Sequence, residues 1–74
     1  MAEIQLESPV TGVVLKVVAE PGTVVAAGDT ILIVESMKME IPVESPEDGT
    51  VTVLQVGEGD QVSEDDPVAI VETA

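Results

Sequence analysis

The chain is built from two copies of one unit. When the sequence is aligned with itself at an offset of 37 positions, residues 8–36 match residues 45–73 without a gap, and ten of the 29 pairs are identical. Average amino-acid usage would give roughly two identities over such a length. The identical pairs are Ser8 and Ser45, Pro9 and Pro46, Gly12 and Gly49, Val14 and Val51, Gly22 and Gly59, Val25 and Val62, Asp29 and Asp66, Ile33 and Ile70, Val34 and Val71, and Glu35 and Glu72. A repeat of this kind indicates one supersecondary unit used twice. Because neither copy can bury its apolar face alone, the two copies must pack together.

The apolar residues predict strands rather than helices. They include 15 Val, 5 Ile and 4 Leu with no aromatic residue, so 20 of these 24 side chains are β-branched. Branching at Cβ suits a pleated sheet and costs rotamer freedom in a helix. Residues 50–53 alternate Thr and Val, as a half-buried strand does. The core should therefore be aliphatic and made by sheets.

Each copy divides into short strands separated by turns. Ser-Pro followed by Gly12 or Gly49 opens the unit, and we expect the proline to fix φ and the glycine to permit a tight turn. The expected strands cover residues 12–18 and 49–56, 24–25 and 61–62, and 31–35 and 68–72, with two more at Ile4–Leu6 and Met39–Val43. The pattern thus predicts about eight strands and no helix.

Two four-strand units predict an all-β fold, a flattened barrel-sandwich hybrid of two four-stranded antiparallel sheets related by a pseudo-two-fold axis. We expect a single domain over residues 1–74. Met37, which lies in the segment joining the copies, aligns with Ala74. A two-fold axis would therefore place this connection at one end of the molecule and the termini near the other.

The composition excludes several classes of partner and site. The net charge is −13, from 15 acidic residues and two lysines. Nucleic acids and anionic membranes are therefore excluded as partners, because binding them needs Lys and Arg to neutralise phosphates. The chain has no Cys and no His, so it has no disulfide and no usual set of zinc ligands. The negative charge favours solubility. It is also compatible with electrostatic steering of this protein toward basic clefts on partner proteins.

The sequence also predicts a cytoplasmic protein. The longest strongly apolar runs, such as Ile31–Val34, are far shorter than the ~20 residues of a helical membrane span. The first residues lack the basic region and the apolar stretch of a signal peptide. The initiating Met1 favours a free subunit over an excised domain.

The connection between the copies is Glu-Ser-Met-Lys-Met-Glu at residues 35–40, and its residues are not those that a tight turn favours. Strands this close in sequence form a tight hairpin, whose tip is Met37-Lys38. Tight hairpin turns favour Asn-Gly or Asp-Gly because φ must be positive, so Met and Lys are poor choices. Local rules broken at one place often mark function.

This motif resembles the attachment site of the biotinyl domains of biotin-dependent carboxylases. The resemblance rests on Glu35-Ser36-Met37-Lys38-Met39 and extends over essentially the whole chain, including the paired Ser-Pro-x-x-Gly units and the Gly-Asp turns. It implies a flattened barrel of two four-stranded sheets, in agreement with the repeat. It implies biotin in amide linkage to Lys38, with Met37 and Met39 as the flanking methionines of the motif.

The resemblance further implies a biotin carboxyl carrier that catalyses nothing itself. A biotin protein ligase would attach biotin to Lys38, and the tethered biotin would carry a carboxyl group from a biotin carboxylase to a carboxyltransferase. Such a chain is a carrier subunit or domain of a multi-component biotin-dependent carboxylase, with an acyl-CoA carboxylase as the expected type. We assign no catalytic residue and no metal ligand.

Two other functions remain open from the sequence. One is a lipoyl carrier of a 2-oxo acid dehydrogenase or glycine cleavage complex, whose fold is similar but whose lysine usually follows Asp and precedes Ala. The other is an unmodified barrel-sandwich adaptor that mediates assembly only. Intact mass distinguishes the three, because the chain would carry one biotinyl group, one lipoyl group or neither.

Each motif residue also has a purely structural interpretation. Lys38 could be an ordinary solvated turn lysine, and Met37 and Met39 could fill the core, with Met39 pointing inward. Lys16, the other lysine, lies within a strand and is expected to be structural. Glu35 and Glu40 are expected to be solvated residues at strand ends, with partner recognition as the alternative.

Overall fold

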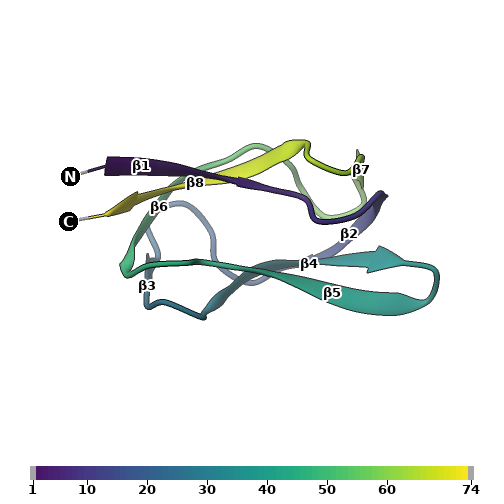
Figure 1. Ribbon diagram of the computed structural model, residues 1–74, viewed down its shortest axis with the longest axis horizontal. Helices are drawn as coiled ribbons and strands as arrows, with labels where there is room; N and C mark the ends of the chain where they lie inside the picture. The colour runs from purple at the N-terminus through teal and green to yellow at the C-terminus, as the bar shows by residue number, and fades with distance from the viewer. Residues whose placement is uncertain (1, 74) are drawn as a thin grey trace.

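The computed structural model describes residues 2–73 and contains eight strands (Figure 1). They are β1 (Ala2–Glu7), β2 (Gly12–Val17), β3 (Val24–Val25), β4 (Thr30–Ser36), β5 (Met39–Glu44), β6 (Gly49–Leu54), β7 (Gln61–Val62) and β8 (Pro67–Thr73). Residues 2–73 contain no helix, and so no helix that could cross a membrane. The predicted all-β class and the eight strands are confirmed. The predicted equivalence of Met37 with Ala74 lies outside the described residues.

The strands form two four-stranded antiparallel sheets that stack as a sandwich (Figure 1). One sheet has the order β1-β8-β6-β3 and the other the order β5-β4-β2-β7. Each sheet therefore takes two strands from each half of the chain, so neither half makes a sheet alone. This interleaving lets both apolar faces be buried against each other.

The pairing of the strands repeats with the 37-residue offset of the sequence. Val14 pairs with Val34 between β2 and β4, and Val51 pairs with Val71 between β6 and β8. The register shifts also correspond, since one lies between Val14 and Lys16 and the other between Val51 and Val53. The two sheets are thus related as the predicted pseudo-two-fold axis requires.

The repeat is longer in the structure than in the alignment of residues 8–36 with 45–73. The pairs of β1 with β8 correspond one by one to the pairs of β5 with β4, as Ile4 opposite Val71 corresponds to Ile41 opposite Val34. The equivalent units are therefore residues 2–36 and 39–73. Only the two residues between them, 37 and 38, lack a counterpart among residues 2–73.

The core lies between the sheets and is aliphatic throughout. Its buried apolar residues are Leu6, Val14, Ala19, Val25, Ile31, Leu32, Val34, Val43, Val51, Val62, Val68, Ala69 and Val71. Most of them come in pairs 37 positions apart, such as Val14 with Val51 and Val25 with Val62. The repeated valines of the sequence are therefore equivalent contributions from the two halves to one shared core.

The Ser-Pro unit of each half hydrogen-bonds to the turn before the last strand of the other half. Ser8 is buried. Its hydroxyl donates to the carbonyl oxygen of Val10 at 2.6 Å, and its backbone N–H donates to the carbonyl oxygen of Asp66 at 2.9 Å. Ser45 makes the equivalent bonds to Glu47 and to Asp29. These bonds satisfy a buried hydroxyl that would otherwise cost free energy. The motif is thus part of the framework of the fold.

The role predicted for Gly12 and Gly49 is wrong in one respect. We expected each glycine to permit a tight turn, but both are the first residues of strands, β2 and β6. A Cβ at Gly12 would collide with the backbone oxygen of Glu35, and a Cβ at Gly49 would collide with that of Glu72. Glycine is needed here because the neighbouring backbone approaches closely.

The molecule is elongated, with principal extents of 36, 17 and 16 Å. The turn between β4 and β5 lies at one end, and the paired residues Ala2 and Thr73 lie at the other (Figure 1). This is the arrangement that the repeat predicted. It leaves the connection between the two halves projecting from the body of the sandwich.

Candidate functional site

A two-residue turn closes the projecting hairpin, and we call Met37 and Lys38 the tip turn. Ser36 and Met39 form the last pair of β4 and β5, so only these two residues lie between the strands. Their φ angles are positive, 51° for Met37 and 65° for Lys38, as a type I′ turn requires. Neither residue is Gly, Asn or Asp. Each positive φ costs about 1–2 kcal/mol for such a residue, so the backbone is strained where the sequence predicted it.

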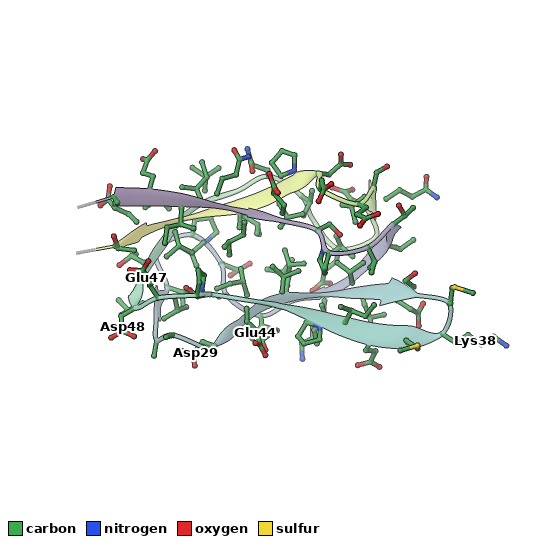
Figure 2. All side chains as sticks on the ribbon, viewed as in Figure 1. Asp29, Lys38, Glu44, Glu47 and Asp48 are labelled. Atoms are coloured by element: carbon green, nitrogen blue, oxygen red, sulfur yellow. The ribbon has the colours of Figure 1, made fainter. Side chains whose placement is uncertain are left out.

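The side chain of Lys38 points away from the molecule. It is exposed, and Figure 2 shows its amine at the extreme end of the hairpin. Because the turn is short and pinned by the Ser36–Met39 pair, the base of this side chain is held in place. The arrangement presents one primary amine at the end of a rigid, narrow body.

The two methionines beside Lys38 are also exposed. Met37 exposes 92% of its surface and Met39 exposes 63%. The core-filler interpretation of these residues is therefore wrong. Met39 lies on the same side of β5 as buried Val43. It stays in solvent because β5 extends past the sandwich at this point. Exposed apolar side chains of this size are available for contact with a partner.

Two acidic residues lie opposite each other one step below the tip turn. Glu35 pairs with Glu40, and both are exposed. The equivalent pair, Glu3 with Glu72, is at the far end of the molecule, where there is no lysine. Like charges directly opposite each other on a sheet are mildly destabilising. Since the acidic pair occurs at both ends, it does not by itself distinguish the lysine-bearing end, and a recognition role for Glu35 or Glu40 remains a hypothesis.

Lys16 has a different setting from Lys38. It lies within β2, opposite Ile33 of β4, and its side chain is exposed on the sheet. Its backbone is part of regular strand pairing. The structural interpretation of Lys16 thus agrees with its position, and the tip turn bears the other lysine.

The lysine-bearing end is a projection and not a cavity. A surface hollow of about 690 Å³ lies at the other end, where Val24 and Val25 of β3 meet Gly49, Thr50 and Thr73. Residues 2–73 contain no group of three or more His, Asp or Glu side chains arranged to hold a metal ion. The chemistry that this geometry supports is therefore modification of an exposed amine, followed by presentation of the attached group to another site.

All the predicted site residues lie together because they are consecutive in sequence. Met37, Lys38 and Met39 occupy the tip turn and the strand residue that follows it. The structure adds two facts that local sequence did not contain. These are the exposure of Met39 and the acidic pair formed by Glu35 and Glu40.

Comparison with known families gives a match over nearly the whole chain. Residues 4–71 match the biotin/lipoyl family model, whose description is "Biotin-requiring enzyme". No curated protein sequence matches the chain.

Two solved structures of carboxylases contain a region similar to this chain. One is the crystal structure of urea carboxylase from Kluyveromyces lactis, with a TM-score of 0.91 and 36% identity over 97% of the chain. The other is a single-chain, multi-domain long-chain acyl-CoA carboxylase, with a TM-score of 0.89 and 27% identity over 97% of the chain. The chain spans only 6% and 7% of these two proteins.

Proposed function

Because the chain belongs to the biotin/lipoyl family of biotin-requiring enzymes, we propose that it is a biotin carboxyl carrier with biotin in amide linkage to Lys38. The observation that carries this proposal is the position of Lys38 between two exposed methionines, in a strained turn at the end of an elongated sandwich. A strained backbone persists only where the surrounding structure holds it, and such strain clusters at functional sites.

The tip turn fits the attachment of a prosthetic group. The Lys38 side chain is exposed and points away from both sheets, so an activating enzyme has access to its Nζ (Figure 2). The ammonium must first lose a proton, since only the neutral amine is a nucleophile. The Nζ then forms an amide bond with the carboxyl carbon of activated biotin, and the activating group leaves. Residues 2–73 hold no histidine or cysteine, so we propose that a separate biotin protein ligase provides the base.

The chain contributes position, and the prosthetic group contributes the reactivity. Bound biotin would supply a ureido nitrogen able to carry a carboxyl group. The short hairpin and its paired base keep Lys38 at a defined point, while the 17 by 16 Å cross-section lets this end enter a cleft. Tethering raises the effective concentration of the carried group at each site that the arm can reach.

We propose three partners for this end of the molecule: the biotin protein ligase, a biotin carboxylase and a carboxyltransferase. The similarity to regions of a urea carboxylase and a long-chain acyl-CoA carboxylase supports a biotin-dependent carboxylase as the setting, and we propose that this carboxylase is multi-component. An acyl-CoA carboxylase is the type we propose. On this proposal the chain alone shows neither ATPase nor carboxylase activity, and its biotinylated form stimulates ATP-dependent bicarbonate fixation by its biotin carboxylase.

The family also includes lipoyl carriers, and the residues beside Lys38 argue against that alternative. Lipoyl hairpins usually place Asp before the lysine and Ala after it, whereas this chain has Met37 and Met39. Intact mass spectrometry after co-expression with a biotin ligase, and separately with a lipoate ligase, tests the choice. We expect one biotinyl group in the first sample and no addition in the second. A lipoyl group, or no addition in either sample, would contradict the proposal.

A further inference from the structure

Within residues 2–73, the side chains that mild oxidants attack lie beside Lys38. Thiols and thioethers react most readily, and the chain has no Cys, Trp, Tyr or His. It has three methionines, of which Met1 lies outside the described residues. Within residues 2–73 the two thioethers, of Met37 and Met39, flank the lysine of the tip turn.

Both thioethers are accessible, and the fold does not depend on them. Met37 is 92% exposed and Met39 is 63% exposed, whereas the core consists of buried Val, Ile, Leu and Ala. A sulfoxide in a core disrupts packing because it places a polar group among apolar ones. At these two positions the sulfoxide would lie in solvent, so oxidation would change the surface and leave the sandwich intact.

We propose that Met37 and Met39 form an oxidation-sensitive modification site that controls the attachment of the prosthetic group to Lys38. A hydroperoxide transfers one oxygen atom to each thioether sulfur, forming an S–O bond as its O–O bond breaks. The sulfur is oxidised to a sulfoxide, and the peroxide is reduced to water or an alcohol. The proposal rests on the proposed function, since it requires an enzyme that docks on the tip turn to modify Lys38.

The physical basis is the change in the surface next to the amine. A methionine thioether is apolar, flexible and easily buried against a partner. A sulfoxide oxygen is a strong hydrogen-bond acceptor, so burying it without a donor is unfavourable. An enzyme that closes over the tip turn would therefore bind the oxidised hairpin less well. Methionine sulfoxide reductases act on the two sulfoxide epimers, so the modification is reversible.

The experiment uses the full chain before any biotin is attached, because biotin contains a thioether of its own. The protein is treated with graded hydrogen peroxide, and peptide mass mapping locates each added oxygen. Circular dichroism checks the fold. The kcat/KM of a biotin ligase is then measured before oxidation, after oxidation and after treatment with both classes of sulfoxide reductase. We expect kcat/KM to fall by at least ~10-fold on oxidation and to recover on reduction.

Variants of this chain supply the controls. Met37→Leu with Met39→Leu removes both sulfurs and keeps apolar side chains of similar volume, and its own rate should be unaffected by peroxide. Ala2 is the counterpart of Met39 in the other half and is exposed at the opposite end. Adding Ala2→Met to the double leucine variant creates an oxidisable residue far from Lys38, and its oxidation should leave the rate unchanged.

Two results would overturn the proposal. One is an unchanged rate for protein shown by mapping to carry oxygen on both methionines. The other is an equal loss of rate in the double leucine variant, which would place the sensitive group elsewhere. The unoxidised parent is the test of the proposed function, because failure to accept biotin at Lys38 appears there before any peroxide is added.

Discussion

Gly28 and Asp65 occupy the same position in the two halves of the molecule, and both have positive φ, 92° and 72°. Each lies in the turn before the last strand of its unit. The backbone N–H of Gly28 donates to the carbonyl oxygen of Ser45 at 2.8 Å, and that of Asp65 donates to the carbonyl oxygen of Ser8 at 2.8 Å. The fold therefore requires a left-handed backbone conformation at this position in both copies. In the second copy the residue that adopts it is an aspartate.

Replacing Asp65 by Gly should stabilise the protein by about 0.5 kcal/mol. Glycine removes the cost of a side chain in the left-handed region, about 1–2 kcal/mol for most residues and less for Asp, but it adds freedom to the unfolded chain. Urea unfolding followed by circular dichroism measures the difference. Asp65→Ala is the control and should lose stability, because alanine tolerates positive φ less well than aspartate. A less stable Asp65→Gly variant would contradict this account.

Substituting Gly12 or Gly49 by Ala should destabilise the protein by more than about 2 kcal/mol, because a Cβ cannot fit against a backbone oxygen without moving a strand. The oxygens belong to Glu35 and Glu72. Gly57→Ala is the matched control, since the nearest atom to its Cβ would be the Asp60 Oδ2 at 3.9 Å. Thermal and urea unfolding should show nearly parental stability for the control. Equal effects at all three glycines would exclude the close-approach explanation.

Lys38→Arg should abolish attachment of biotin, whereas Lys16→Arg should not affect it. Arginine keeps the charge but has no amine that a ligase can acylate. Lys16 lies within β2 opposite Ile33 and not at the tip turn. Streptavidin blotting after co-expression with a biotin ligase gives the readout. Labelling of the Lys38→Arg variant would refute the assignment.

Met37→Asp combined with Met39→Ala, with Lys38 retained, should weaken biotinylation or the later carboxyl transfer while the sandwich still folds. The substitutions replace flexible apolar contacts by a charge and a small side chain. Because Met37 and Met39 are 92% and 63% exposed, the loss of stability should be well below the ~2–5 kcal/mol of a buried Met→Ala change. Gain of lipoylation need not follow, since specificity also rests on rejection. If the ligase kinetics and carboxyl-transfer rates of the double variant equal those of the parent, the methionines have no functional role.

Placing Asn-Gly in the tip turn should stabilise the hairpin and eliminate its function. Met37→Asn with Lys38→Gly supplies the residues that a type I′ turn favours, so we expect a gain of about 1–2 kcal/mol in the free energy of unfolding. The same variant has no amine to modify. Urea unfolding and streptavidin blotting measure the two effects together. No gain in stability would show that the tip turn is not strained.

The sequence predicted most of the strands because strand formation here is a local property. Alternating Val and Thr, and Gly or Pro at the turns, mark the strands without knowledge of their partners. The ends were less accurate: the strand expected at residues 49–56 ends at Leu54, and the strand expected at residues 31–35 extends over Thr30–Ser36. Hydrogen bonding between strands continues beyond the apolar residues that signal them. The site was predictable for a similar reason, because the tip turn and its motif are contiguous.

The sequence by itself determined the repeated unit, its strands and the lysine that the hairpin presents, since these depend on periodicity and on neighbouring residues. Only the tertiary structure decided that each sheet takes strands from both halves, because pairing such as that of β1 with β8 joins the two ends of the chain. It also decided that Gly12 must leave room for Glu35 and that Met39 stays in solvent. These features depend on contacts between residues that are distant in sequence. Such contacts form only when the two apolar faces are buried against each other.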